Sequence, residues 1–119
     1  MRLNFRIPYL PELSKNRMKG FRNGRYFTSA AYKKACEKLV LLIKTKMKRE
    51  KVEFREDRVL IRLLLNKPRP NIDVVNFVGA WCDIIKTAIS VDDRYFWLIA
   101  NWKEDKREKA YFEVEIIQN

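Results

Sequence analysis

Residues 58–93, RVLIRLLLNKPRPNIDVVNFVGAWCDIIKTAISVDD, decide the predicted fold. The stretch opens with an apolar run over residues 58–66, which predicts a central strand covered on both faces. Two prolines end that run. Apolar residues then recur at helical spacing over residues 74–88, with Val75 expected on the inner face, and a tight turn leads to the Asp92-Asp93 pair. The stretch therefore predicts a strand, a helix and the entry to a second strand.

The flanking segments predict the remaining elements of a small α+β domain. Alternating or aromatic-rich segments predict three more strands, over residues 2–7, 95–102 and 110–117. Apolar residues at helical spacing predict a helix over residues 30–49, capped by Thr28 or Ser29. We therefore expect one domain over residues 1–119, a small mixed β-sheet with two packed helices in the order β-α-β-α-β-β.

The charge of the chain points to a polyanionic partner. The formal net charge is +11 at pH 7, and such an excess favours binding to nucleic acid. Residues 1–55 hold 16 Lys/Arg and 4 Asp/Glu, a net charge of +12, whereas residues 56–119 hold 10 and 11, a net charge of −1. The basic surface is therefore expected in the first half of the chain and the acidic candidates in the second. A solvated, lysine-rich surface is the simpler alternative.

Other features of the composition exclude several classes of chemistry. The chain has no histidine, which excludes Ser-His-Asp and Cys-His catalysis and histidine-bound zinc. Cys36 and Cys82 are far apart and are expected to be buried free thiols. There is no apolar run of membrane-spanning length and no signal-peptide pattern, so we expect a cytoplasmic protein without a membrane partner.

A long basic segment over residues 12–27 is the first candidate for contact with nucleic acid. Its basic and polar residues are interleaved with aromatic residues, an arrangement suited to phosphate contacts and base stacking. A mobile, solvated loop is the alternative. The candidates for DNA binding are Lys15, Asn16, Arg17, Lys19, Arg22 and Arg25, together with Arg69 and Lys86 later in the chain.

Three aspartates are the candidates for a metal site. Asp73 follows a strand, and the Asp92-Asp93 pair precedes the next one, so we expect the three carboxylates to converge at one end of the sheet. Magnesium takes oxygen ligands, and phosphodiester hydrolysis uses such an ion to activate water. The alternative is that Asp73 caps a helix and that the pair belongs to a turn.

The chain resembles the RusA family of Holliday junction resolvases over nearly its whole length. The resemblance rests on features that occur in the family's order: the strand that runs into Ile7-Pro8-Tyr9-Leu10-Pro11, the stretch Ser14-Lys15-Asn16-Arg17, the helix entry Thr28-Ser29-Ala30 with Tyr32, and the acidic residues Asp73, Asp83 and Asp92-Asp93.

The resemblance implies a function and a set of site residues. The family forms homodimers that bind four-way DNA junctions and cut two strands symmetrically with Mg²⁺, for which Mn²⁺ is a possible substitute. By resemblance, Asp73, Asp92 and Asp93 are metal-binding catalytic residues, and Asn76 matches the asparagine that follows the family's aspartates.

Two positions depart from the family pattern. Where the family has a second aspartate and a lysine, this chain has Val75 and Gly79 when Asn76 is aligned. Lys86 and Arg94 are candidates to replace the missing cation. These departures leave open an alternative function, a junction-binding or nucleic-acid-binding protein of the same fold with weak or no cleavage.

Overall fold

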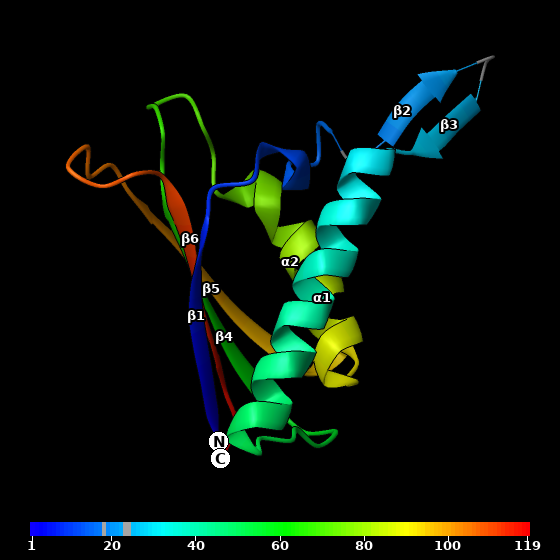
Figure 1. Cartoon of the computed structure of the whole chain (residues 1–119), viewed down its shortest axis with the longest axis vertical. Helices are drawn as coiled ribbons and strands as arrows, with labels where there is room; N and C mark the ends of the chain where they lie inside the picture. The colour runs from blue at the N-terminus through cyan, green and yellow to red at the C-terminus, as the bar shows by residue number, and fades with distance from the viewer. Residues whose placement is uncertain (18, 23–24) are drawn as a thin grey trace.

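A four-stranded mixed sheet forms one layer of the molecule, and two helices cover one of its faces (Figure 1). The strand order across the sheet is β1-β6-β4-β5, and β4 and β5 run parallel while the other neighbouring pairs run antiparallel. The elements are β1 (Arg2–Pro8), α1 (Ala30–Glu50), β4 (Val59–Asn66), α2 (Val75–Ile89), β5 (Phe96–Lys103) and β6 (Tyr111–Ile117). The predicted α+β class and the two helices are confirmed.

The computed structural model describes residues 1–17, 19–22 and 25–119, and it describes residues 19–22 and 25–27 by their backbone only. The segment over residues 12–27 contains more regular structure than we expected. A 3-10 helix, η1 (Pro11–Leu13), is followed by an antiparallel hairpin of β2 (Lys19–Arg22) and β3 (Arg25–Thr28). The prediction of an irregular loop is therefore wrong, and the hairpin projects from the end of α1 (Figure 1).

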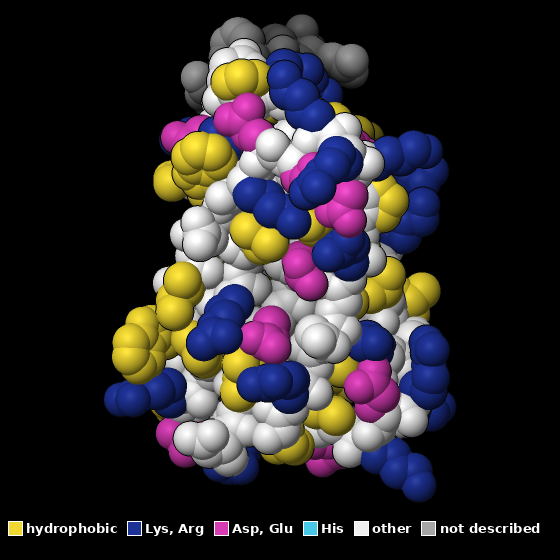
Figure 2. All heavy atoms as spheres, turned by 90° about the vertical axis from the view of Figure 1, so that its left-hand side faces the viewer, with side chains coloured by type: hydrophobic (Ala, Val, Ile, Leu, Met, Phe, Trp, Pro, Cys, Tyr) yellow, Lys and Arg dark blue, Asp and Glu magenta, His cyan; other side chains and the backbone are white. Residues whose placement is uncertain are grey.

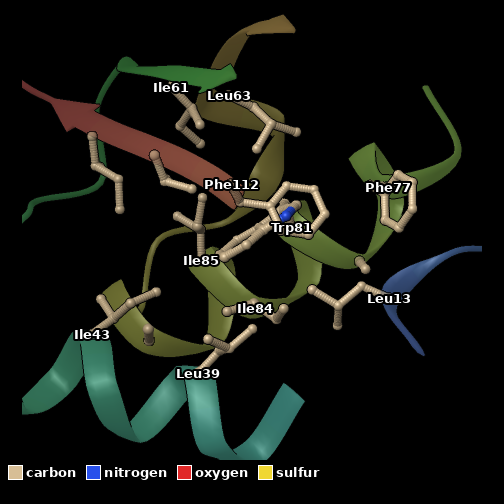
Figure 3. Packing of buried hydrophobic residues seen from close by; sticks show 14 of the residues in the cluster. Leu13, Leu39, Ile43, Ile61, Leu63, Phe77, Trp81, Ile84, Ile85 and Phe112 are labelled. Carbon is tan, nitrogen blue, oxygen red and sulfur yellow. The ribbon is translucent and has the colours of Figure 1, made fainter. Parts of the chain in front are cut away.

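The core lies between the sheet and α2, which is itself covered by α1 (Figure 1). Three aromatic rings meet at its centre (Figure 3): the Phe112 centroid lies 5.2 Å from that of Phe77 and 5.5 Å from that of Trp81. Edge-to-face packing of this kind adds to the apolar area that the rings bury. This packing fixes α2 against the sheet.

Strand β4 is central, as predicted, but it is covered on one face only. Val59, Ile61 and Leu63 are buried beneath the helices, whereas Arg62 on the other face is exposed. The expectation of cover on both faces is wrong because both helices pack on the same side of the sheet (Figure 1). We call the uncovered side the open face.

Helix α1 has a side-chain cap at its first turn, and both helices end in the same backbone conformation. Ser29 caps α1, since its Oγ accepts a hydrogen bond from the Tyr32 amide at 3.3 Å. Lys51 and Ser90 end α1 and α2 in the left-handed conformation, with φ of 56° and 58°. Val75, expected inward, is 62% exposed, because the inner face of α2 is formed from Phe77 onward.

The helices of the described residues include none that is both long and apolar enough to cross a membrane.

Candidate functional site

The predicted metal ligand Asp73 lies at the N-terminal end of α2. Its Oδ1 accepts a hydrogen bond from the Val75 amide at 3.0 Å, and its carbonyl accepts one from the Asn76 amide at 3.1 Å. The Asp73 side chain is exposed. One carboxylate oxygen thus helps to start the helix, as the capping alternative predicts, while Oδ2 makes no hydrogen bond within the described part of the chain.

The Ser14–Arg17 stretch packs onto this same end of α2. The Lys15 amide donates to the Asn76 carbonyl at 2.8 Å, which joins two segments about 60 positions apart in sequence. The stretch is shaped by its own bonds, since Ser14 accepts from the amides of Asn16 at 3.3 Å and Arg17 at 2.8 Å. The side chains of Lys15, Asn16 and Arg17 are exposed. The fold therefore brings predicted DNA-binding residues to the helix end that carries Asp73 and Asn76.

Arg69 lies in the turn that leads into α2, where its carbonyl accepts a hydrogen bond from the Ile72 amide at 3.3 Å. Burial raises the pKa of Tyr9. The positive charges of Arg69 and Arg17 lower it by a smaller amount. We call Lys15, Asn16, Arg17, Arg69, Asp73 and Asn76 the N-end cluster.

The Asp92-Asp93 pair lies at the other end of α2. Asp92 Oδ1 accepts a hydrogen bond from the Arg94 amide at 3.0 Å, and this bond, ahead of any other cause, lowers the pKa of Asp92 below its ordinary value. Asp93 Oδ1 lies 4.0 Å from Lys86 Nζ. Both carboxylates are exposed. Lys86 therefore lies beside the acidic pair, where it could act as the replacement cation.

The structure does not bring Asp73 and the Asp92-Asp93 pair together. Helix α2 has 15 residues between them, which corresponds to about 22 Å of helix. Strands β4 and β5 are parallel, so the segment that leaves β4 and the segment that enters β5 lie at opposite ends of the sheet. The predicted convergence within one chain is wrong for this reason. Among the described residues, no three or more His, Cys, Asp or Glu side chains form a group that could hold a metal ion.

The remaining predicted DNA-binding residues, Lys19, Arg22 and Arg25, have side chains outside the described part of the structure. The backbone of their hairpin extends beyond α1 (Figure 1). The outward face of α1 adds a row of exposed lysines: Lys33, Lys34, Lys38, Lys44 and Lys48.

The open face contributes less unpaired positive charge than its arginine content suggests. Arg2 and Arg62 both approach Glu115, at 3.4 and 3.5 Å, and Arg6 lies 3.5 Å from Glu113. Figure 2 accordingly shows blue and magenta side chains intermixed across this side of the molecule. Among the described side chains, the exposed basic residues of the N-end cluster and α1 are therefore better candidates for contact with a polyanion than these arginines of the open face.

The contact between Lys67 and Trp102 was not predicted from the sequence. Lys67 Nζ lies 3.8 Å from the centre of the Trp102 ring, and Trp102 is 50% exposed. The contact forms because the Lys67 amide donates to the Lys103 carbonyl at 2.8 Å, which aligns the ends of β4 and β5. Sequence inspection could have found the proline turn and the tryptophan but not their pairing, which depends on the strand register.

Comparison with known proteins adds no family assignment: no protein-family model matches the chain, and a search of curated proteins returns no match.

Proposed function

We propose that the protein is a Mg²⁺-dependent endonuclease of the RusA type that acts as a homodimer on four-way DNA junctions. The observation that carries the proposal is the hydrogen bond from the Lys15 amide to the Asn76 carbonyl. It joins the two most informative stretches of the family resemblance, and it attaches the segment that carries Lys15 and Arg17 to the helix end that carries Asp73. Phosphate contacts next to a hydrolytic carboxylate are what a nuclease requires.

The arrangement of the aspartates limits how a metal ion is held. Within one chain, Asp73 and the Asp92-Asp93 pair do not fit a single ion, because α2 separates them. Magnesium is commonly bound by only one or two carboxylates, with water and substrate phosphate completing its shell. Asp73 belongs to the N-end cluster, which holds the proposed phosphate contacts, so we assign it the first role in holding the ion.

Cleavage of a labelled four-way junction by the purified protein with Mg²⁺ or Mn²⁺ tests the proposal. We expect paired nicks at symmetric positions in two opposing strands. Asp73→Asn is expected to reduce cleavage by about 100-fold or more, because a metal ion contributes several kcal/mol to such a reaction, while junction binding is retained. Binding without symmetric nicks at any metal tried would contradict the proposal.

Asp57→Asn is the matched control. Asp57 is exposed, and its Oδ1 likewise accepts a backbone hydrogen bond, from the Arg58 amide at 2.8 Å. The same chemical change is therefore made at a carboxylate with no assigned role, and cleavage should remain at the wild-type level.

A second candidate function is binding of branched nucleic acid without cleavage. The observation that favours it is the distance between the two acidic positions along α2, together with Val75 and Gly79 at positions where the RusA family has an acid and a base. In this case Asp93→Asn leaves every measured activity intact. The two functions are thus distinguished by the same cleavage assay.

A further inference from the structure

Trp102 is an exposed tryptophan at the exit end of β5, on the side of the sheet that the helices cover. By strand register it stands beside Leu65 of β4, which belongs to the core, and side chains paired across neighbouring strands point to the same face. The residues that precede it on this face, Phe96, Leu98 and Ala100, are partly buried, whereas Trp102 is 50% exposed. The ring therefore extends beyond the edge of the core.

The Trp102 ring is held by Lys67. The Lys67 ammonium lies 3.8 Å from the ring centre and also donates a hydrogen bond to the Pro70 carbonyl at 3.3 Å. A cation over the face of a tryptophan is attracted by the negative potential of the ring. Lys67 thus orients the ring, places a positive charge beside it, and ties it to the turn that leads into α2.

The same end of the sheet carries the N-end cluster. The turn that begins at Lys67 leads directly to Asp73 and the start of α2 (Figure 1). Lys67 and Asp73 are six positions apart in the sequence, and six residues span at most about 20 Å. Stacked nucleotides are spaced about 3.4 Å apart along a strand. A strand whose phosphates lie on the N-end cluster therefore reaches Trp102 within about six nucleotides.

The charge around Trp102 suits a polyanion. Residues 67–70 and 101–110 together hold six Lys/Arg and three Asp/Glu, a net charge of +3. Two of these acids, Asp105 and Glu108, are in ion pairs with neighbouring cations at 3.0 and 3.9 Å. The exposed ring is therefore surrounded by an excess of positive charge, which favours the approach of phosphate groups.

We propose that Trp102 stacks on an unpaired base of a bound DNA strand whose neighbouring phosphates contact Lys67 and the N-end cluster. Aromatic side chains that stack on bases, next to cations that follow the backbone, are the means by which proteins bind single strands. The stacking role rests on the proposed function for its nucleic-acid binding and not for cleavage. It favours branched or single-stranded DNA over an intact duplex, because a base must leave the duplex stack before a side chain can stack on it.

Trp97 provides a matched control on the same strand. It is 57% exposed, and the guanidinium carbon of Arg58 lies 5.6 Å from its ring centre, so it too is an exposed tryptophan beside a cation. Trp97 lies near the start of β5 and stands beside Leu60 on the open face. It therefore differs from Trp102 in being at the opposite end and on the opposite face of the sheet from the N-end cluster.

Binding to a labelled twelve-nucleotide dT strand and to a blunt twelve-base-pair duplex, followed by fluorescence anisotropy without divalent metal, tests the stacking role. Trp102→Ala is expected to weaken binding of the single strand by about 5- to 150-fold, the effect of losing one stacked base, and binding of the duplex by less than about two-fold. Trp97→Ala should leave both affinities unchanged. Trp102→Phe should restore most of the single-strand affinity, because an aromatic ring remains.

Three results of these titrations overturn the stacking role. They are an unchanged single-strand affinity in Trp102→Ala, an equal loss in Trp97→Ala, and a loss in Trp102→Ala that is the same for single strand and duplex. The last result would mean that Trp102 only supports the end of the sheet. Circular dichroism checks that each variant is folded, and if Trp102→Ala is not, the fluorescence of variants that keep an aromatic ring decides instead.

Tryptophan fluorescence gives a readout that a purely structural role would not change. In Trp97→Phe, Trp102 is the only exposed tryptophan, since Trp81 is buried, and the dT strand is expected to quench its emission by stacking. In Trp102→Phe the same strand should leave the emission of Trp97 unchanged. Equal quenching in the two variants, or quenching in neither, overturns the assignment.

The two proposals fail separately. Quenching of Trp102 by the dT strand without cleavage of a four-way junction refutes the nuclease and supports the stacking role. Symmetric cleavage of the junction without this quenching refutes the stacking role alone. A wild-type protein that binds neither the dT strand nor the junction overturns both.

Discussion

The buried amide of Asn66 connects the sheet to the segment that follows β5, and its removal should destabilise the protein measurably. Asn66 is 0% exposed at the end of β4. Its Oδ1 accepts from the Asp105 amide at 2.8 Å, and its Nδ2 donates to the carbonyls of Asp105 at 3.2 Å and Lys109 at 3.5 Å. These bonds hold the turn over residues 104–110 against the sheet, close to the Lys67 and Trp102 contact.

The expected cost of Asn66→Ala follows from these bonds. The two shorter bonds contribute about 1 kcal/mol each, and the Asp105 amide loses its partner, so the free energy of unfolding should fall by roughly 2–3 kcal/mol. With a urea dependence of roughly 1–3 kcal/mol per molar, the unfolding midpoint should fall by about 0.7–3 M.

Urea denaturation followed by circular dichroism is the assay, and Asn4→Ala is its control. Asn4 is exposed on the open face, so its replacement should change the free energy of unfolding by no more than about 0.5 kcal/mol. An Asn66→Ala midpoint within error of wild type would refute the role given to this amide. Equal losses in both variants would show that the effect does not depend on burial.

Three further outcomes follow from other contacts. The Arg107 guanidinium and then its backbone amide lower the pKa of Asp105 to about 2, so NMR should show this carboxylate titrating near that value, and Arg107→Met should raise the midpoint. Any stabilisation from the ionised Asp105 is present above the ordinary pKa of an aspartate and is lost as the pH falls toward 2. Phe112→Ala removes a ring that packs against three others, and calorimetry should show a loss of about 3–5 kcal/mol. Arg69→Ala should lower the salt dependence of DNA binding by about one unit of slope, whereas Arg62→Ala, whose guanidinium is already paired, should not.

Much of the fold could be predicted because hydrophobic period is a local property. The alternation in β1 and β6, the apolar run of β4 and the helical spacing of α1 and α2 each follow from residues within a few positions of one another. The β2–β3 hairpin is not predicted by hydrophobic period, because its short strands consist largely of basic and aromatic residues, a composition that also suits a phosphate-binding loop.

The candidate site was harder to predict because it depends on chain direction. A helix between two strands does not by itself say whether the strands are parallel, and only parallel β4 and β5 place Asp73 and the Asp92-Asp93 pair at opposite ends of the sheet. The exposure of Val75 shows the same limit on a smaller scale. Its apolar character fits the helical period, but the rotation of α2 about its axis is set by the packing of Trp81 and Phe77 against Phe112.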